Sequence, residues 1–109
     1  MKITVFGLTL SSSWGNGDAT PYRALLCALH RLGHEVAFYE QDAYYYAQRR
    51  DFTACPYSHL ALYRSWEEVP PRALAEAATS EVVLTGSYIP KGARLHDELL
   101  ALPGPMRVF

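Results

Sequence analysis

The stretch 13–18 combines residue types that bind ligands at close range. It reads Ser-Trp-Gly-Asn-Gly-Asp. Gly15 and Gly17 let a backbone come close to a ligand, and Trp14 offers an aromatic stacking face. Asp18 can accept hydrogen bonds from hydroxyl groups or act as a base. The predicted substrate contacts in this stretch are Ser13, Trp14, Gly15, Asn16 and Gly17, with Asp18 as the candidate catalytic residue.

Two further pairs of polar residues follow predicted strands. Glu40 and Asp42 form a carboxylate pair that can do acid–base work or hold hydroxyl groups. Alternatively, Asp42 caps a helix and Glu40 is solvated. Ser87 and Tyr88 offer two hydroxyls, in a composition that is also common in ordinary loops. We include all four residues as candidate substrate contacts.

The glycines of the first stretch only partly match a dinucleotide-binding fingerprint. Glu40 follows at about the right distance for a ribose contact. The first glycine of the pattern comes well after the preceding apolar run, however, and Thr20 stands where the third glycine belongs. We therefore do not expect dinucleotide binding. A surface loop in which Trp14 only plugs the sheet edge remains an alternative.

Other catalytic and cofactor patterns are missing from the sequence. There is no Ser-His-Asp set in a GxSxG context and no Walker motif. The four histidines and the two cysteines, Cys27 and Cys55, have no metal-ligand spacing. We expect no metal and no cofactor, and a partly exposed thiol at Cys27.

The elements that must position the candidate residues alternate between strands and helices. Apolar and β-branched runs predict strands, and runs with helical spacing, caps and prolines predict helices. The expected strands cover 2–8, 35–40, 59–64, 81–86 and 106–109. The expected helices cover 20–33, 42–50, 71–79 and 93–102.

The first helix has the clearest signals. Thr20 is the expected N-cap, Pro21 the first helical residue and Gly33 the C-terminal cap. A stripe of apolar residues at helical spacing should face the core. Its members are Tyr22, Leu25, Leu26, Leu29 and Leu32.

This alternation predicts an α/β fold: a Rossmann-like open parallel sheet of about five strands with helices on both faces, in a single domain over 1–109. In such sheets ligands bind at the carboxyl ends of the strands. The loops expected at that edge are 9–20, 40–42 and 87–92, which contain every candidate residue above.

Composition excludes several classes of function. The net charge is −1, from 10 basic and 11 acidic residues without a long run of one sign, which argues against nucleic-acid binding. No apolar run approaches the ~20 residues that span a bilayer, and no signal-peptide pattern is present. We expect a soluble, cytoplasmic protein. Because the chain stops inside an expected strand, we also expect the first part of a longer polypeptide, with an open sheet edge that favours self-association.

Several of these residues resemble the start of glycosyltransferases of the spore-maturation CgeB-like group. The similarity begins with the apolar run 3–8 and is most specific at Ser-Ser-Ser-Trp-Gly-Asn-Gly, residues 11–17. It extends over nearly the whole chain. Further matching positions are Thr20, Tyr22, Arg23, Leu25, Leu26, residues 32–36, Tyr39, Glu40, Asp42, Tyr46, Ala47, Arg50, Asp51, Leu62, Tyr63, Ser87, Tyr88, Pro90 and Gly92.

The resemblance implies half of a GT-B architecture, in which two Rossmann-like domains face each other across a cleft. This chain would be the acceptor-side domain, and a nucleotide-sugar donor would bind a C-terminal domain that it lacks. The acceptor is unknown. Two departures from the family are Asp18, where histidine is more usual, and Gly86, where a threonine precedes Ser-Tyr. The alternative is a non-catalytic Rossmann-like module that binds a ligand or a partner.

Overall fold

A computed structural model gives the fold of the chain. It describes residues 1–12, 19–41, 50–51, 55–64, 70–86, 89 and 92–108. Most of the predicted substrate contacts, and Asp18, lie outside these ranges.

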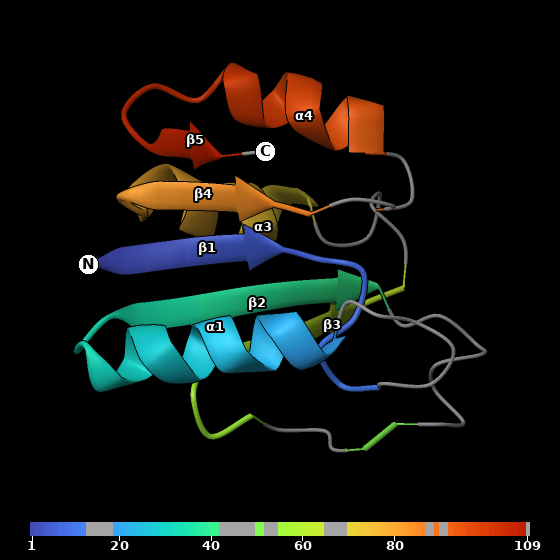
Figure 1. Cartoon of the computed structure of the whole chain (residues 1–109). Helices are drawn as coiled ribbons and strands as arrows, with labels where there is room; N and C mark the ends of the chain where they lie inside the picture. Colours follow the sequence, from blue (N-terminus) through green and yellow to red (C-terminus); the bar gives the residue numbers. More distant parts are fainter. Residues whose placement is uncertain are drawn as a thin grey trace.

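Five parallel strands form one sheet (Figure 1). Their order across the sheet is β3-β2-β1-β4-β5, and every neighbouring pair is parallel. The chain therefore starts in the middle of the sheet and fills one half before the other, as in a Rossmann-like fold. The strands are β1 (Lys2–Phe6), β2 (Glu35–Gln41), β3 (His59–Tyr63), β4 (Val82–Thr85) and β5 (Met106–Val108).

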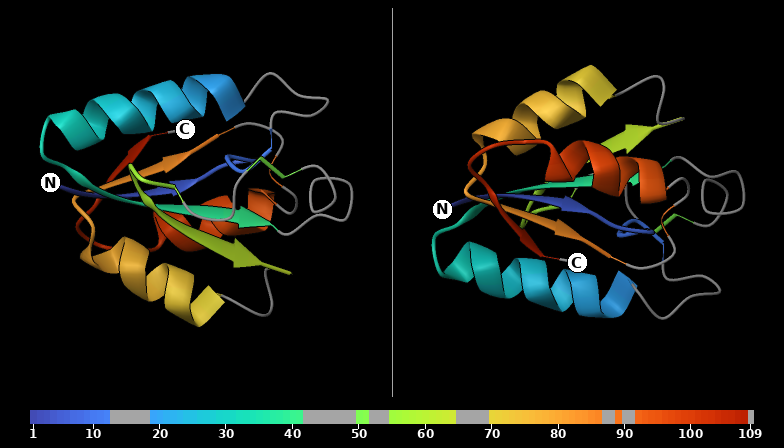
Figure 2. Two further views of the ribbon diagram at one scale, coloured as in Figure 1. Left: turned by 90° about the horizontal axis from the view of Figure 1, so that it is seen from below. Right: turned by 90° about the horizontal axis from the view of Figure 1, so that it is seen from above.

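Helices cover both faces of the sheet (Figure 2). The helix α1 (Ala19–Arg31) lies on one face, and α3 (Pro70–Thr79) and α4 (Gly92–Leu100) lie on the other. The predicted fold class, an open parallel sheet between helical layers, is confirmed. The expected helix over 42–50 falls outside the described residues except for Arg50.

Two apolar clusters fill the space between the sheet and its helices. Because side chains alternate along a strand, Val5 and Phe38 face α1 while Phe6 and Tyr39 face the other layer. The cluster under α1 contains Ile3, Val5, Leu10, Leu26, Val36 and Phe38. The cluster under α3 and α4 contains Phe6, Ala37, Tyr39, Tyr63, Ala73, Ala77, Val83, Leu95 and Leu99.

The apolar stripe of α1 is narrower than the sequence predicts. Leu26 is fully buried and Leu29 packs against the core. Leu25 is 38% exposed and Leu32 is 73% exposed, so their assignment to the core was wrong. Leu25 points about 100° away from Leu26 around the helix, and Leu32 follows the last helical residue.

Both ends of α1 can be compared with their predicted signals. The helix begins at Ala19, so Thr20 lies inside its first turn and is not the N-cap. Pro21 is tolerated there because the first N–H groups of a helix have no intrahelical acceptor. The predicted cap at Gly33 is confirmed. Its φ is +86°, and the N–H groups of Gly33 and His34 donate to the carbonyls of His30 and Leu29, at 3.0 Å each, in a Schellman motif.

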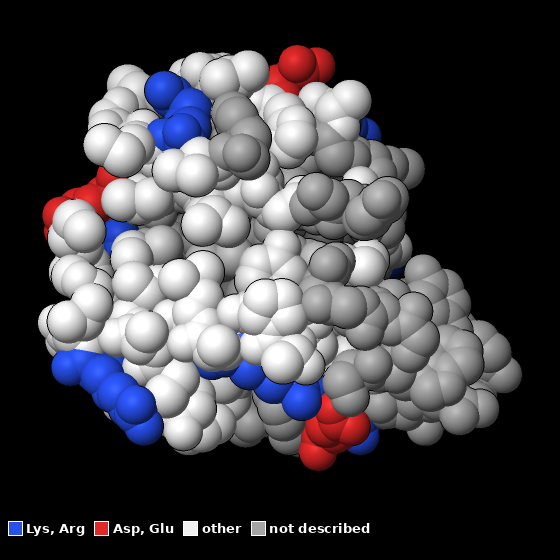
Figure 3. Space-filling model, in the orientation of Figure 1, with Lys and Arg blue, Asp and Glu red and all other residues white. Residues whose placement is uncertain are grey.

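The surface view shows basic and acidic side chains in separate small groups on one face (Figure 3). They do not gather there into one large patch of a single sign. Among the helices of the described ranges, none is long and apolar enough to cross a membrane.

Candidate functional site

The strand order of the sheet reverses between the neighbouring strands β1 and β4. The chain after β1 turns toward β2, and the chain after β4 turns toward β5, because these central strands have their successors on opposite sides. Ligands of open parallel sheets bind at such a point.

Glu40 is the one predicted contact that the structure describes, and it is completely buried. Its Oε1 accepts hydrogen bonds from the backbone N–H groups of Leu10, at 2.6 Å, and Ser11, at 3.0 Å. Its Oε2 accepts from the Ser11 hydroxyl at 2.6 Å. The alternative of a solvated Glu40 is therefore wrong. The carboxylate lies under the loop that leaves β1 and fixes the start of that loop.

Arg50 supplies the opposite charge. Its Nη2 lies 3.8 Å from Glu40 Oε2, and its Nε donates to the Ser11 hydroxyl oxygen at 2.9 Å. The Ser11 hydroxyl thus donates to the carboxylate and accepts from the guanidinium. A buried carboxylate is costly unless it is both paired and hydrogen-bonded, and Glu40 is both.

A second arginine ties the same loop to α1 and to Asp51. Arg23 Nε donates to the Leu10 carbonyl at 2.9 Å, and its Nη2 donates to Asp51 Oδ2 at 2.7 Å. The Asp51 N–H donates to the Ser11 carbonyl at 2.6 Å. We call this set of six residues the Glu40 cluster: Leu10, Ser11, Arg23, Glu40, Arg50 and Asp51.

The Glu40 cluster joins the ends of two segments that carry predicted contacts. The segment 13–18 begins just after Ser11, and the segment 42–49 ends just before Arg50. The Asp51–Ser11 backbone bond and the arginine contacts hold these two points of the chain together. The cluster therefore positions the base of both segments at the carboxyl edge.

Tyr22 occupies the space beside the ends of β1 and β4. Its ring packs edge-on against Phe38, with centroids 5.1 Å apart. A Cβ at Gly86 would lie 1.6 Å from the Tyr22 hydroxyl oxygen, and a Cβ at Gly7 would lie 2.3 Å from Phe38 Cζ. A side chain at either strand end would displace an aromatic ring: the buried ring of Phe38 at Gly7, and the hydroxyl end of Tyr22 at Gly86. Tyr22 thus brings a hydroxyl to the ends of β1 and β4, where the strand order reverses.

Tyr63 lies at the end of β3, beside Gln41 in the register of the sheet. Burial, and then the negative charge of Glu40, raise the pKa of Tyr63 to about 12. Tyr63 therefore stays neutral at physiological pH. On β4, the Thr85 hydroxyl contacts His96 Nε2 at 3.1 Å.

Most predicted site residues lie outside the described ranges: Ser13, Trp14, Gly15, Asn16, Gly17, Asp18, Asp42, Ser87 and Tyr88. Their roles remain predictions. Both oxygens of Glu40 accept hydrogen bonds from the protein, so its visible role is to position the loop, and a contact with substrate stays a prediction.

The sequence interpretation missed the arginines as partners of this edge. The spacing of Arg23 and Arg50 in the sequence offers no signal that they meet near Ser11. The signal that was available is charge balance, because a carboxylate at the end of a buried strand needs a cation nearby.

Neither similarity to known proteins nor a metal site assigns a function to this edge of the sheet. Comparison of the chain with protein-family models, with curated proteins and with solved structures found no match. Within the described part of the chain, no group of three or more His, Cys, Asp or Glu side chains is arranged to hold a metal ion.

Proposed function

We propose that this chain is the acceptor-side domain of a GT-B glycosyltransferase that resembles the CgeB-like group. It would act with a second domain that binds a nucleotide-sugar donor and transfer the sugar to an acceptor. A cytoplasmic location belongs to the same proposal. The observation that carries it is the Glu40 cluster, which holds the base of the candidate loop at the carboxyl edge of a Rossmann-like sheet.

The cluster supports the proposal because it places a buried ion pair, Glu40 with Arg50, at the start of the loop that follows β1. Catalysis and selective binding require contact groups that are held in place before the ligand arrives. A surface loop without function has no need of a fully buried carboxylate, two arginines and a backbone bond across 40 positions of sequence. The strand order adds that this base lies where sheets of this class receive ligands.

In the proposal, the segment after the cluster contacts the acceptor. Asp18 acts as the base that takes a proton from the acceptor hydroxyl. The remaining contacts are Ser13, Trp14, Gly15, Asn16, Gly17, Asp42, Ser87 and Tyr88, with Glu40 holding the loop.

The test uses the natural polypeptide with its following domain, assayed for sugar hydrolysis or transfer with a panel of nucleotide sugars. The substitution Asp18→Asn should lower turnover about 10²–10⁴-fold, the usual contribution of a general base. Asp97→Asn, on the exposed side of α4, is the matched control and should leave turnover unchanged. Tight binding of a nucleotide sugar by this chain alone would contradict the acceptor-side assignment.

One observation favours the second candidate, a non-catalytic module that binds a partner. β5 is one of the two edge strands of the sheet, and its Met106 and Val108 are 66% and 41% exposed. Leu100 of the neighbouring helix is 56% exposed. An exposed edge strand with apolar side chains is a template for pairing with another chain. Sedimentation of the wild type and of Met106→Lys tests this: a dimer that the lysine disrupts supports the second candidate.

A further inference from the structure

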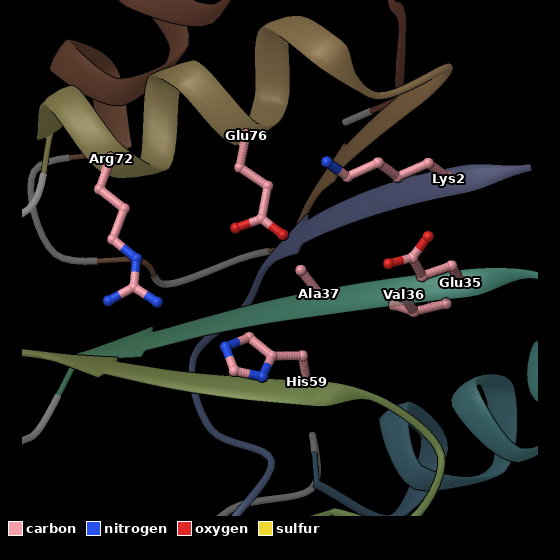
Figure 4. A pocket seen from close by; sticks show the side chains of 7 residues that line it. All are labelled: Lys2, Glu35, Val36, Ala37, His59, Arg72 and Glu76. Carbon is pink, nitrogen blue, oxygen red and sulfur yellow. The ribbon is translucent and has the colours of Figure 1, made fainter.

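A groove of about 340 Å³ lies at the amino edge of the sheet, between β3 and α3 (Figure 4). It is lined by Lys2, Glu35, Val36, Ala37, His59, Arg72 and Glu76. This volume corresponds to about ten water molecules, which is enough for a small metabolite. The groove lies on the face of β2 that Ala37 and Tyr39 share, whereas Glu40 alternates to the face of Phe38, so the groove is not part of the site proposed above.

A small side chain on β2 creates the space. On the face of β2 that packs toward α3, Ala37 lies between Glu35 and Tyr39, and His59 is its register partner on β3. α3 packs against β1, and two of its residues, Arg72 and Glu76, line the groove. Ala37 is itself only 4% exposed, but its small side chain leaves room for the groove between α3 and β3.

The groove carries charges of both signs at separate places. The Arg72 guanidinium extends into it from α3, and the His59 imidazole faces it from β3 (Figure 4). Glu35 lies at the other end, next to Lys2, while the Glu76 carboxylate points from α3 toward Ala37. The groove therefore has a cationic end, at Arg72 and His59, and an acidic side, at Glu35 and Glu76, which also carries the Lys2 ammonium.

Two of the charged groups are fixed by contacts with the protein. The Tyr39 hydroxyl donates a hydrogen bond to Glu76 Oε2, and the Lys2 Nζ donates to Thr79 Oγ1 at 3.0 Å. Burial, with the nearby Glu76, raises the pKa of Tyr39, so that it remains a donor. Within the described residues, the side chains of Glu35, His59 and Arg72 make no such contact. These three groups are available to a ligand.

A ligand with a charge of one sign only would bind one group of this groove and be repelled by a like charge nearby. An anion held by Arg72 would lie near Glu76, and a cation held by Glu76 would lie near Arg72. A guanidinium binds a carboxylate through two parallel hydrogen bonds, and a carboxylate binds an ammonium group in the same charge-assisted way. Complementary placement of both charges removes the repulsion.

We propose that this groove binds a small zwitterion, a molecule with a carboxylate for Arg72 and His59 and an ammonium group for Glu76 and Glu35. An α-amino acid has this chemistry at the size of the groove. The inference goes beyond the proposed glycosyltransferase function and does not depend on it.

The experiment is an NMR titration of the ¹⁵N-labelled chain with alanine, and separately with acetate and with ethylammonium at the same ionic strength. Alanine should produce saturable shifts of the amides over 35–37, 59 and 72–76, with a Kd in the millimolar range or tighter. Acetate and ethylammonium should bind at least tenfold more weakly. Equal affinity for either of them, or no saturable shift with alanine, would overturn the proposal.

Three variants locate the binding. Arg72→Gln and Glu35→Gln should each weaken alanine binding about tenfold or more, which is ~1.4 kcal/mol. Both side chains are exposed, so the fold should persist, and the amide spectrum verifies this directly. Arg31→Gln is the matched control, because Arg31 is an exposed arginine of α1 on the other face. An equal loss in Arg31→Gln would show a non-specific charge effect and refute the site.

Discussion

Glu35 and Glu40 belong to the same strand, β2, and have opposite surroundings. Glu35 begins the strand, is exposed and lines the groove at the amino edge. Glu40 lies near the carboxyl end, is fully buried, and accepts hydrogen bonds from Leu10 and Ser11. Five positions separate them, and they differ in what the protein uses the charge for.

The difference lies in which chain segment covers each end of the strand. At the carboxyl edge, the loop after β1 folds over Glu40 and turns its backbone N–H groups toward the carboxylate. At the amino edge, Glu35 stays exposed, and the small side chain of Ala37 leaves a groove beside it between α3 and β3. The protein therefore uses charge to organise structure at one edge and leaves charge exposed at the other.

The largest expected effect is the substitution Glu40→Gln. It removes the buried carboxylate charge that faces the Arg50 guanidinium and places an amide NH₂ near it, so the free energy of unfolding should fall by about 3–5 kcal/mol. Glu35→Gln is the matched control at the other end of the strand and should change it by less than about 0.5 kcal/mol. Urea denaturation measures both. Equal effects would remove the contrast between the edges.

Tyr63 allows the carboxyl edge to be tested by pH. Its pKa of about 12 lies above the ordinary value of about 10, so the folded state holds the proton more tightly than the unfolded state. The stability from this group is complete below about pH 10 and is lost as the pH rises toward 12. The loss should approach about 2–3 kcal/mol.

The comparison of wild type with Tyr63→Phe isolates this group from the other tyrosines. The stability difference between the two proteins should shrink as the pH rises from about 10 to about 12. Denaturation curves at several pH values provide the measurement. A difference that stays constant would show that Tyr63 titrates at its ordinary pKa.

Alanine substitutions at Gly7 and Gly86 compare a ring that is fixed in the core, Phe38, with one whose outer end can be displaced, Tyr22. Gly7→Ala drives a methyl group into the buried ring of Phe38 and should cost about 1–3 kcal/mol. Gly86→Ala meets the hydroxyl end of Tyr22, which is only partly buried and can swing away, so it should cost less. Thermal unfolding gives both values. A larger loss for Gly86→Ala would show that Tyr22 is held as firmly as Phe38.

The smallest expected effect concerns a neutral buried pair. The Ser80 hydroxyl donates to the Glu76 carbonyl at 2.9 Å, so the Thr4 hydroxyl must be the donor in their 2.5 Å contact. Ser80→Ala leaves the buried Thr4 donor without its acceptor and should cost about 1–2 kcal/mol. Thr4→Val removes the donor itself and should cost less. The opposite ranking by urea denaturation would reverse the assigned direction of the bond.

The sequence predicted the strands and the fold class because their signals are local. Each strand is an apolar or β-branched run, and Gly33 marks the end of α1 by the conformation that glycine alone adopts easily. The start of α1 and the width of its stripe were predicted less well. Leu25 and Leu32 have the same residue type as Leu26, and only the packing against the sheet decides which of them is buried.

The sequence could predict where the Glu40 cluster lies, but not which residues contact one another within it. The carboxyl edge follows from the alternation of strands and helices, and Glu40 from its position at a strand end. The contact of Ser11 with Arg50 and Asp51 joins residues about 40 positions apart, and no local pattern encodes it. The groove beside Ala37 depends on where α3 lies, which is again a tertiary property.

The Glu40 cluster has a consequence for how this protein can change over generations. All of its members lie outside the segments 13–18 and 42–49. If these two segments contact the ligand, as we propose, selection for a stable fold acts on one set of residues and selection for recognition acts on another. Variants that exchange either segment while keeping Ser11, Arg23 and Arg50 retain the foundation of the edge, so new recognition can be acquired without first rebuilding the domain.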